Sequence, residues 1–287
     1  MSTSELTLGR PVPLAPRRVG ARLLRSELRL VFGRRRNLGM LAVLAGAPIL
    51  LGVIVRVASP APGAGPPLLS QVTQNGFFLG LASLIFASPL FLPMVISVVS
   101  GDSVAGEANS GTLRNLLVVP VARTRLLAVK YAGVATYALA CIVTLMVSGL
   151  VTGFVLFPAG DVVLLSGGTV GMVDALGRAV LVVGYMTVML ATLGAIGLFF
   201  STLTEAPMGA MAATVTVAVV SQILDAIPQL SAIHEYLHTH WWMTFIDVLR
   251  EPILFDDIRT GLLVSAAYIA IFGSLAWARF TTRDITS

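Results

Sequence analysis

Apolar residues occur along the chain in long uncharged blocks that are separated by short polar segments. A helix needs about 20 mostly apolar residues to cross the hydrocarbon core of a bilayer. Blocks of about this length lie at residues 37–57, 77–100, 131–157, 179–200, 207–224 and 261–280. The prolines of residues 59–67 exclude a buried helix between the first two blocks, because proline lacks the amide donor and fixes φ. The pattern predicts an all-α membrane protein whose six transmembrane helices occupy residues 37–280.

Composition agrees with a membrane protein. Hydrophobic residues make up 56% of the 287 residues and charged residues 11%, whereas an ordinary soluble domain has about 45–50% and 25%. This excludes a water-soluble globular enzyme. A nucleic-acid partner is also excluded, since no polar stretch is long enough to form a basic domain. The single cysteine, Cys141, lies in the third block, so no intrachain disulfide can form.

Positive charge is shared unequally between the two sides of the predicted helices. If the N-terminus is cytoplasmic, the outer side holds only four of the 19 Lys and Arg residues, namely Arg56, Arg178, Arg250 and Arg259. Cytoplasmic segments carry the excess of Lys and Arg in membrane proteins. We therefore expect a multi-pass protein of the cell (inner) membrane with both termini in the cytoplasm.

The N-terminal segment divides into two parts. Residues 1–16 contain three prolines and no periodicity, which predicts a disordered tail. Residues 17–36 have a helical pattern, with arginines on one face and apolar side chains beside it: Arg18, Arg22, Arg25 and Arg29, then Ala21, Leu24, Leu28, Val31 and Phe32. This pattern predicts an amphipathic helix in the inner membrane interface. The alternative is that these arginines only fix the topology. Residues 281–287 are expected to be a cytoplasmic tail.

The second cytoplasmic segment, residues 101–129, carries the most informative motif. A short helix is expected to begin at Gly111 and Thr112 and to end at Pro120. The segment resembles the coupling loop of type-2 ABC exporter permeases through residues in the same order: Gly106, Glu107, Gly111, Thr112, Leu113, Leu116, Leu117, Pro120, Arg123, Leu126, Leu127 and Lys130. Ala122 departs from the family pattern, because many members have a serine there that would cap the next helix.

The resemblance implies the permease subunit of an ATP-driven exporter. Its partners would be a second permease chain, identical or similar, and a cytoplasmic ABC ATPase dimer that binds ATP and magnesium. The residues implied to couple to this ATPase are Gly106, Glu107, Gly111, Thr112, Leu113, Arg114, Leu116, Leu117, Pro120 and Arg123. Independently, the only lysine, Lys130, is not part of a P-loop. We therefore expect no cofactor in this chain and no ATPase activity of its own.

Polar residues within the predicted spans indicate what could be transported. No span has an ionisable residue at its centre, which favours an amphiphilic or hydrophobic cargo, such as a drug, a peptide or a lipid-like compound, over an ion. Candidates for lining the pathway, next to the kinking prolines Pro89 and Pro93, are Ser83, Ser88, Ser97, Thr214, Thr216, Ser221 and Gln222. The alternative is that these hydroxyls bond to their own helix backbone. Two pairs of small residues fit close helix packing: Gly149 with Gly153, and Gly209 with Ala213.

The outer loop, residues 225–260, contains the motif HEYLH at 234–238. On a helix, His234 and His238 could bind zinc while Glu235 activates water. A third ligand could come from His240, Asp247, Glu251 or Asp256. A membrane zinc metallopeptidase is therefore the alternative function, and a scaffold that uses the same ATPase without transport is another. The simpler interpretation is an interfacial helical or re-entrant segment that forms an outer gate with His234, Tyr236, Trp241 and Trp242.

Overall fold

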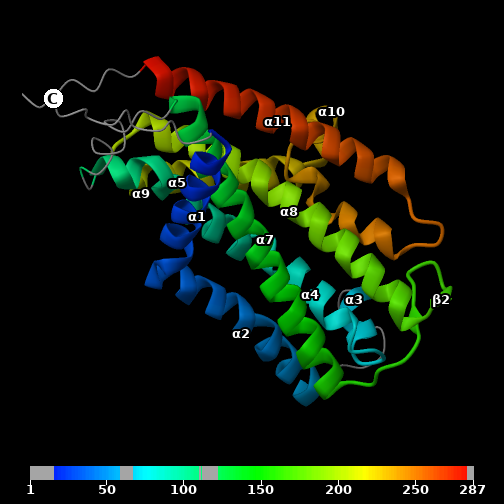
Figure 1. The fold of residues 1–287 in the computed structure, drawn as a ribbon. Coiled ribbons are helices and arrows are strands. Elements are labelled where there is room, and N and C mark those ends of the chain that lie inside the picture. The colour runs from blue at the N-terminus through cyan, green and yellow to red at the C-terminus, as the bar shows by residue number, and fades with distance from the viewer. Residues whose placement is uncertain (1–15, 59–66, 110, 112–121, 283–287) are drawn as a thin grey trace, which may run out of the picture.

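The protein is helical throughout most of its length in the computed structural model, which describes residues 16–58, 67–109, 111 and 122–282 (Figure 1). Within these residues, six helices are long and apolar enough to cross a membrane. The prediction of an all-α protein with six candidate spans is confirmed. These helices are α2 (Arg35–Ala58), α5 (Phe91–Asn109), α7 (Arg123–Leu156), α8 (Met172–Leu203), α9 (Pro207–Asp225) and α11 (Phe255–Thr282).

Shorter elements connect these helices. Before α2 lies α1 (Pro16–Gly33), which occupies most of the segment predicted to be amphipathic. Two strands, β1 (Val162–Val163) and β2 (Thr169–Val170), form an antiparallel hairpin between α7 and α8. The remaining elements are α3 (Pro67–Val72), α4 (Phe78–Ala87), the 3₁₀ helices η1 (Pro228–Leu230) and η2 (His240–Leu249), and α10 (Ser231–His234).

The second predicted span, residues 77–100, consists of two helices. Helix α4 ends at Ala87 and α5 begins at Phe91, because Pro89 has no amide hydrogen to continue the helical ladder. Helix α5 then continues to Asn109. The first nine residues of the predicted cytoplasmic loop are therefore helical.

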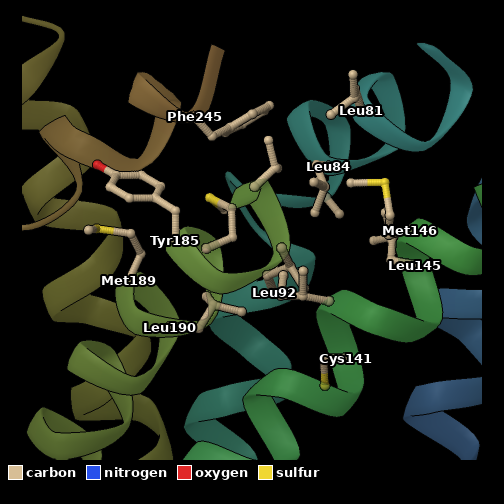
Figure 2. Close-up of a cluster of buried hydrophobic side chains, with 14 of the residues drawn as sticks. Leu81, Leu84, Leu92, Cys141, Leu145, Met146, Tyr185, Met189, Leu190 and Phe245 are labelled. Carbon is tan, nitrogen blue, oxygen red and sulfur yellow. The ribbon is translucent and has the colours of Figure 1, made fainter. Parts of the chain in front are cut away.

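Helices α5 and α8 form the centre of the bundle. Helix α8 packs against α5, α7, α9 and α11, and α7 also packs against α1, α2 and α4 (Figure 1). Apolar side chains from α4, α5, α7, α8 and η2 meet in the core (Figure 2). The outer helices α2 and α11 instead expose large apolar side chains such as Leu50, Val57 and Leu263. Exposed apolar faces on the outer helices suit contact with lipid.

The two ends of the bundle carry different elements. The first residues of α7 lie beside α1 and beside the last residues of α11 (Figure 1). The opposite end holds the β1–β2 hairpin and the first residues of α8 and α11 (Figure 1). The segment that carries the coupling motif thus joins α5 and α7 at the end where α1 lies.

Candidate functional site

A buried lysine connects the two helices that flank residues 110–121. Lys130, in the third turn of α7, is 1% exposed, and its Nζ lies 2.6 Å from Oε1 of Glu107 near the end of α5. The same Nζ lies 3.6 Å from Oε1 of Glu27 in α1. One cation therefore joins α1, α5 and α7. We call Glu27, Glu107 and Lys130 the lysine triad.

A second buried carboxylate lies five residues before Glu107 on α5. Asp102 pairs with Arg34 and with Arg36, whose Nη2 lies 2.8 Å from Oδ2 of Asp102. These arginines lie at the junction of α1 and α2. Gly106 is next to this carboxylate, since a Cβ atom there would lie 2.2 Å from Oδ1 of Asp102. A glycine at this position therefore leaves room for the ion pairs of Asp102.

Members of both sets of ion pairs line one small cavity of about 20 Å³, namely Glu27, Arg34, Asp102 and Glu107. Burial raises the pKa of Glu27, and the attraction of Lys130 opposes this shift. Buried charges are costly unless they are paired, so the partners must keep their positions relative to one another. The arrangement therefore fixes α1, α2, α5 and α7 to one another at this end of the molecule.

The start of α7 is also held to the end of α11. Arg123 Nη1 donates a hydrogen bond of 2.9 Å to the carbonyl of Thr281. A cation at a helix C-terminus is favourable because it satisfies free carbonyls and opposes the helix dipole. No side chain caps α7 at Ala122. The hydroxyl of Thr124 accepts a hydrogen bond of 2.9 Å from Nε1 of Trp277, which adds a second link between α7 and α11.

The structure describes four of the residues that the resemblance assigned to coupling. Gly106 and Glu107 belong to the paired end of α5, and Arg123 starts α7. Gly111 is exposed with φ of 70°, a conformation that favours glycine. The others lie outside the described residues: Thr112, Leu113, Arg114, Leu116, Leu117 and Pro120.

The sequence analysis did not identify Asp102 and Glu27 as residues of this site. Glu27 gave a usable signal, because it lies next to Val31 at the edge of the apolar face of the predicted amphipathic helix, away from the arginines. An acid on such a face requires a cationic partner within the protein. The sequence contains a single lysine, but nothing in local spacing connects two residues that are 103 positions apart.

The candidate pathway residues mostly point into the chain's own core. Ser83, Ser88 and Thr214 are buried, and each donates a hydrogen bond to the carbonyl four residues earlier in its own helix. Ser97 is buried, and Ser221 hydrogen-bonds to Thr239 at 2.6 Å. Only two of the seven candidate pathway residues are not buried. Thr216 is exposed, and Gln222 donates to the carbonyl of Pro89.

The HEYLH segment does not form the helix that a zinc peptidase requires. Helix α10 ends at His234, and Glu235 and the next residue form a turn. His238 is 2% exposed, and its ring packs against Trp242 and Tyr268 with centroids 5.6 and 5.5 Å away. Burial lowers the pKa of His238 to about 4, so this imidazole is uncharged at neutral pH. Because His234 contacts Asp225 instead, the two histidines do not face one site.

The residues expected at an outer gate also divide into two groups. Trp241 and Trp242 belong to η2, which packs against α8 and α11, and both residues are buried. Both residues belong to the hydrophobic core of the chain. Tyr236 is exposed, and its carbonyl accepts a hydrogen bond from Tyr268.

Within the described residues, six helices of membrane-spanning length and apolar composition define a multi-pass membrane protein. The chain matches the family described as ABC-2 family transporter protein over residues 34–221. This match covers more than half of the chain, which therefore belongs to the ABC-2 transporter family and has the fold of its permease component. Comparison with curated proteins gives no match.

Proposed function

We propose that this chain is the permease subunit of an exporter in the cell membrane, with both termini and α1 on the cytoplasmic side. Two permease chains, identical or similar, form the pathway. A separate cytoplasmic ATPase dimer binds ATP and magnesium and docks on the segment between α5 and α7. The observation that carries this proposal is the family match over residues 34–221, and the paired helix ends supply a mechanism.

The mechanism depends on how firmly the docking segment is held. Glu107 and Lys130 join the helices on its two sides at 2.6 Å. A displacement of residues 110–121 by the ATPase therefore moves α5 and α7 together. Through Glu27 and Asp102 the same displacement reaches α1 and α2. Glu107 then acts in coupling by positioning helices within the permease.

The cargo is expected to be amphiphilic or hydrophobic. The buried polar residues of the described chain are mainly serines and threonines. An apolar route without ionisable groups offers no counterion for an inorganic ion. Thr216 and Gln222 of α9 are the pathway candidates that remain accessible.

Purification and transport assays test the proposal directly. A Strep-tagged chain is captured from its own host, and the co-purified proteins are identified and assayed for ATPase activity. Inside-out vesicles are assayed for ATP-dependent uptake of a fluorescent amphiphile. We expect Arg114→Glu to reduce both the captured ATPase and the uptake by at least about tenfold. Arg259→Glu, at an exposed position near the start of α11, is the matched control and should change neither.

Each result has a clear meaning. Capture of a P-loop ATPase without ATP-dependent uptake would contradict the exporter and favour a scaffold. If wild-type protein captures no ATPase, the permease proposal fails. If the Arg114→Glu variant retains full capture and uptake, the docking site lies elsewhere on the chain.

A further inference from the structure

Three side chains with metal-binding atoms meet in the loop between α9 and α11. Asp225 is the last residue of α9, His234 is the last residue of α10 and His240 is the first residue of η2. One ligand atom from each lies within 4.8 Å of the other two. The loop therefore folds back twice to bring two imidazoles to one carboxylate.

The hydrogen bond of His234 orients its ring so that one nitrogen is available to a metal ion. Its Nε2 lies 3.1 Å from the carbonyl oxygen of Ile227. A carbonyl only accepts, so Nε2 carries the hydrogen and neutral His234 has its lone pair on Nδ1. This Nδ1 faces Oδ1 of Asp225 at 3.9 Å. A metal-binding histidine typically donates its other N–H to a carbonyl or carboxylate in this way.

His240 completes the set of ligands. Its Nδ1 lies 2.6 Å from Oδ1 of Asp225, and the carboxylate accepts a hydrogen bond from it. When Nδ1 binds the metal, the ring changes tautomer, so that its hydrogen is carried by Nε2 and the lone pair of Nδ1 is free for the ion. Ligand atoms of a tetrahedral zinc ion lie about 3.4 Å apart when each is about 2.0–2.2 Å from the metal. The two distances to Asp225 therefore change by less than about 1 Å on binding. The side chains of Asp225, His234 and His240 are 28%, 17% and 35% exposed, which leaves room for these movements.

We propose that Asp225, His234 and His240 bind a Zn²⁺ ion that fastens α10 and η2 to the end of α9. Two imidazoles favour zinc and similar transition metals over calcium and magnesium, which prefer oxygen ligands. A fourth position remains for water, because the site is accessible from outside. The site shares only His234 with the HEYLH motif, so it differs from a peptidase site in both its ligands and its geometry. It does not depend on the transport function.

The position of the site suggests what the metal does. Asp225 also lines a cavity of about 210 Å³ between the end of α9 and the break at Ser88 and Pro89, together with Thr239 and Trp242. A metal held by Asp225 fixes one wall of this cavity to the following loop. Zinc is therefore a structural ligand that stabilises the loop between α9 and α11.

The test uses the full chain in detergent with a Strep tag, since a histidine tag would itself bind zinc. After removal of metals with EDTA and dialysis, Zn²⁺ is titrated against a chromogenic chelator. We expect one Zn²⁺ per chain and a rise in Tm of about 5 °C or more at saturation. His240→Ala and Asp225→Asn should each weaken binding by at least about tenfold. Glu235→Gln is the matched control, because Glu235 belongs to HEYLH but not to the site. The affinity of this variant for Zn²⁺ should equal that of the wild type.

A second measurement requires no substitution. Co²⁺ added to the metal-free wild type should give visible d–d absorption bands, which Zn²⁺ then removes. Failure of the wild type to bind either ion would overturn the proposal. So would zinc binding that survives His240→Ala but is lost in Glu235→Gln, because that result would return the site to HEYLH.

Discussion

At the scale of single residues, glycines allow a very close contact between α7 and α4. Gly149 and Gly153 of α7 face Gly80 and Gly76, at and just before the start of α4. A Cβ atom at Gly153 would lie 2.0 Å from the carbonyl oxygen of Gly76, and one at Gly149 would lie 2.4 Å from Cα of Gly80. The sequence predicted close packing at these two positions, and the structure locates their partner within the same chain. Gly209, from the other predicted pair, has open space around it.

Gly153→Ala should destabilise the protein strongly. The added methyl group meets backbone, which cannot rotate away, so α4 and α7 must separate. We expect the free energy of unfolding to fall by about 2 kcal/mol or more, measured by thermal unfolding in detergent. Gly184→Ala is the matched control in α8, because nothing lies within 4 Å of its added Cβ. Alanine should stabilise that helix by about 0.5–1 kcal/mol. Equal Tm values for the two variants would contradict the glycine contact.

At the scale of elements, the lysine triad decides how α1 is attached. The side chains of Glu27, Glu107 and Lys130 are almost completely buried. Removing one member of a buried ion pair costs more than removing all members, because a charge is then left without its partner. The attachment of α1 therefore depends on the complete set.

Lys130→Met should be more harmful than neutralising the whole triad. The single substitution leaves Glu27 and Glu107 facing each other in the interior, and we expect a loss of about 3–5 kcal/mol in the free energy of unfolding. The triple variant Glu27→Gln, Glu107→Gln, Lys130→Met should recover most of this loss. Denaturation in detergent, followed by intrinsic fluorescence, measures both. A triple variant that is less stable than the single one would show that the charges themselves hold the junction together.

The long apolar helices could be predicted from the sequence, but the break between α4 and α5 could not. Uncharged length identified six apolar helices, because crossing a bilayer imposes a minimum length on each one. The interruption at Pro89 could be expected as a kink, but not as the full break between α4 and α5. At this break Gln222 of α9 donates a hydrogen bond of 3.0 Å to the carbonyl of Pro89. A contact between residues 133 positions apart leaves no local pattern in the sequence.

At the scale of the whole molecule, the family could be inferred from one loop, whereas the contacts of the site could not. The order of residues in 101–129 indicated a type-2 permease, and the family match over 34–221 confirms it. The motif did not show that Glu107 pairs with Lys130, because the motif describes sequence order and not direction in space. The HEYLH motif likewise gives only the order of its residues, and not where their side chains point. Its spacing fits a helix, but the chain turns after His234 and brings His240 to Asp225 instead.

The orientation of the molecule provides a final test of the charge distribution. Only four of the 19 Lys and Arg residues lie on the side that we expect to be external, and this excess predicts which loops are cytoplasmic. Two exposed glycines with open space around them make matched reporters: Gly33 at the end of α1 and Gly168 beside the β1–β2 hairpin. Each is replaced by cysteine in a Cys141→Ala background, which removes the only native thiol.

A membrane-impermeant maleimide should label Gly168→Cys in intact cells, or in spheroplasts where an outer membrane blocks access. It should label Gly33→Cys only after the membrane is opened. Labelling both variants under denaturing conditions controls for expression. The reverse pattern would place α1 and the α5–α7 segment outside the cell, where no cytoplasmic ATPase could reach them. Labelling therefore tests the geometric condition on which the exporter mechanism depends, without requiring knowledge of the cargo.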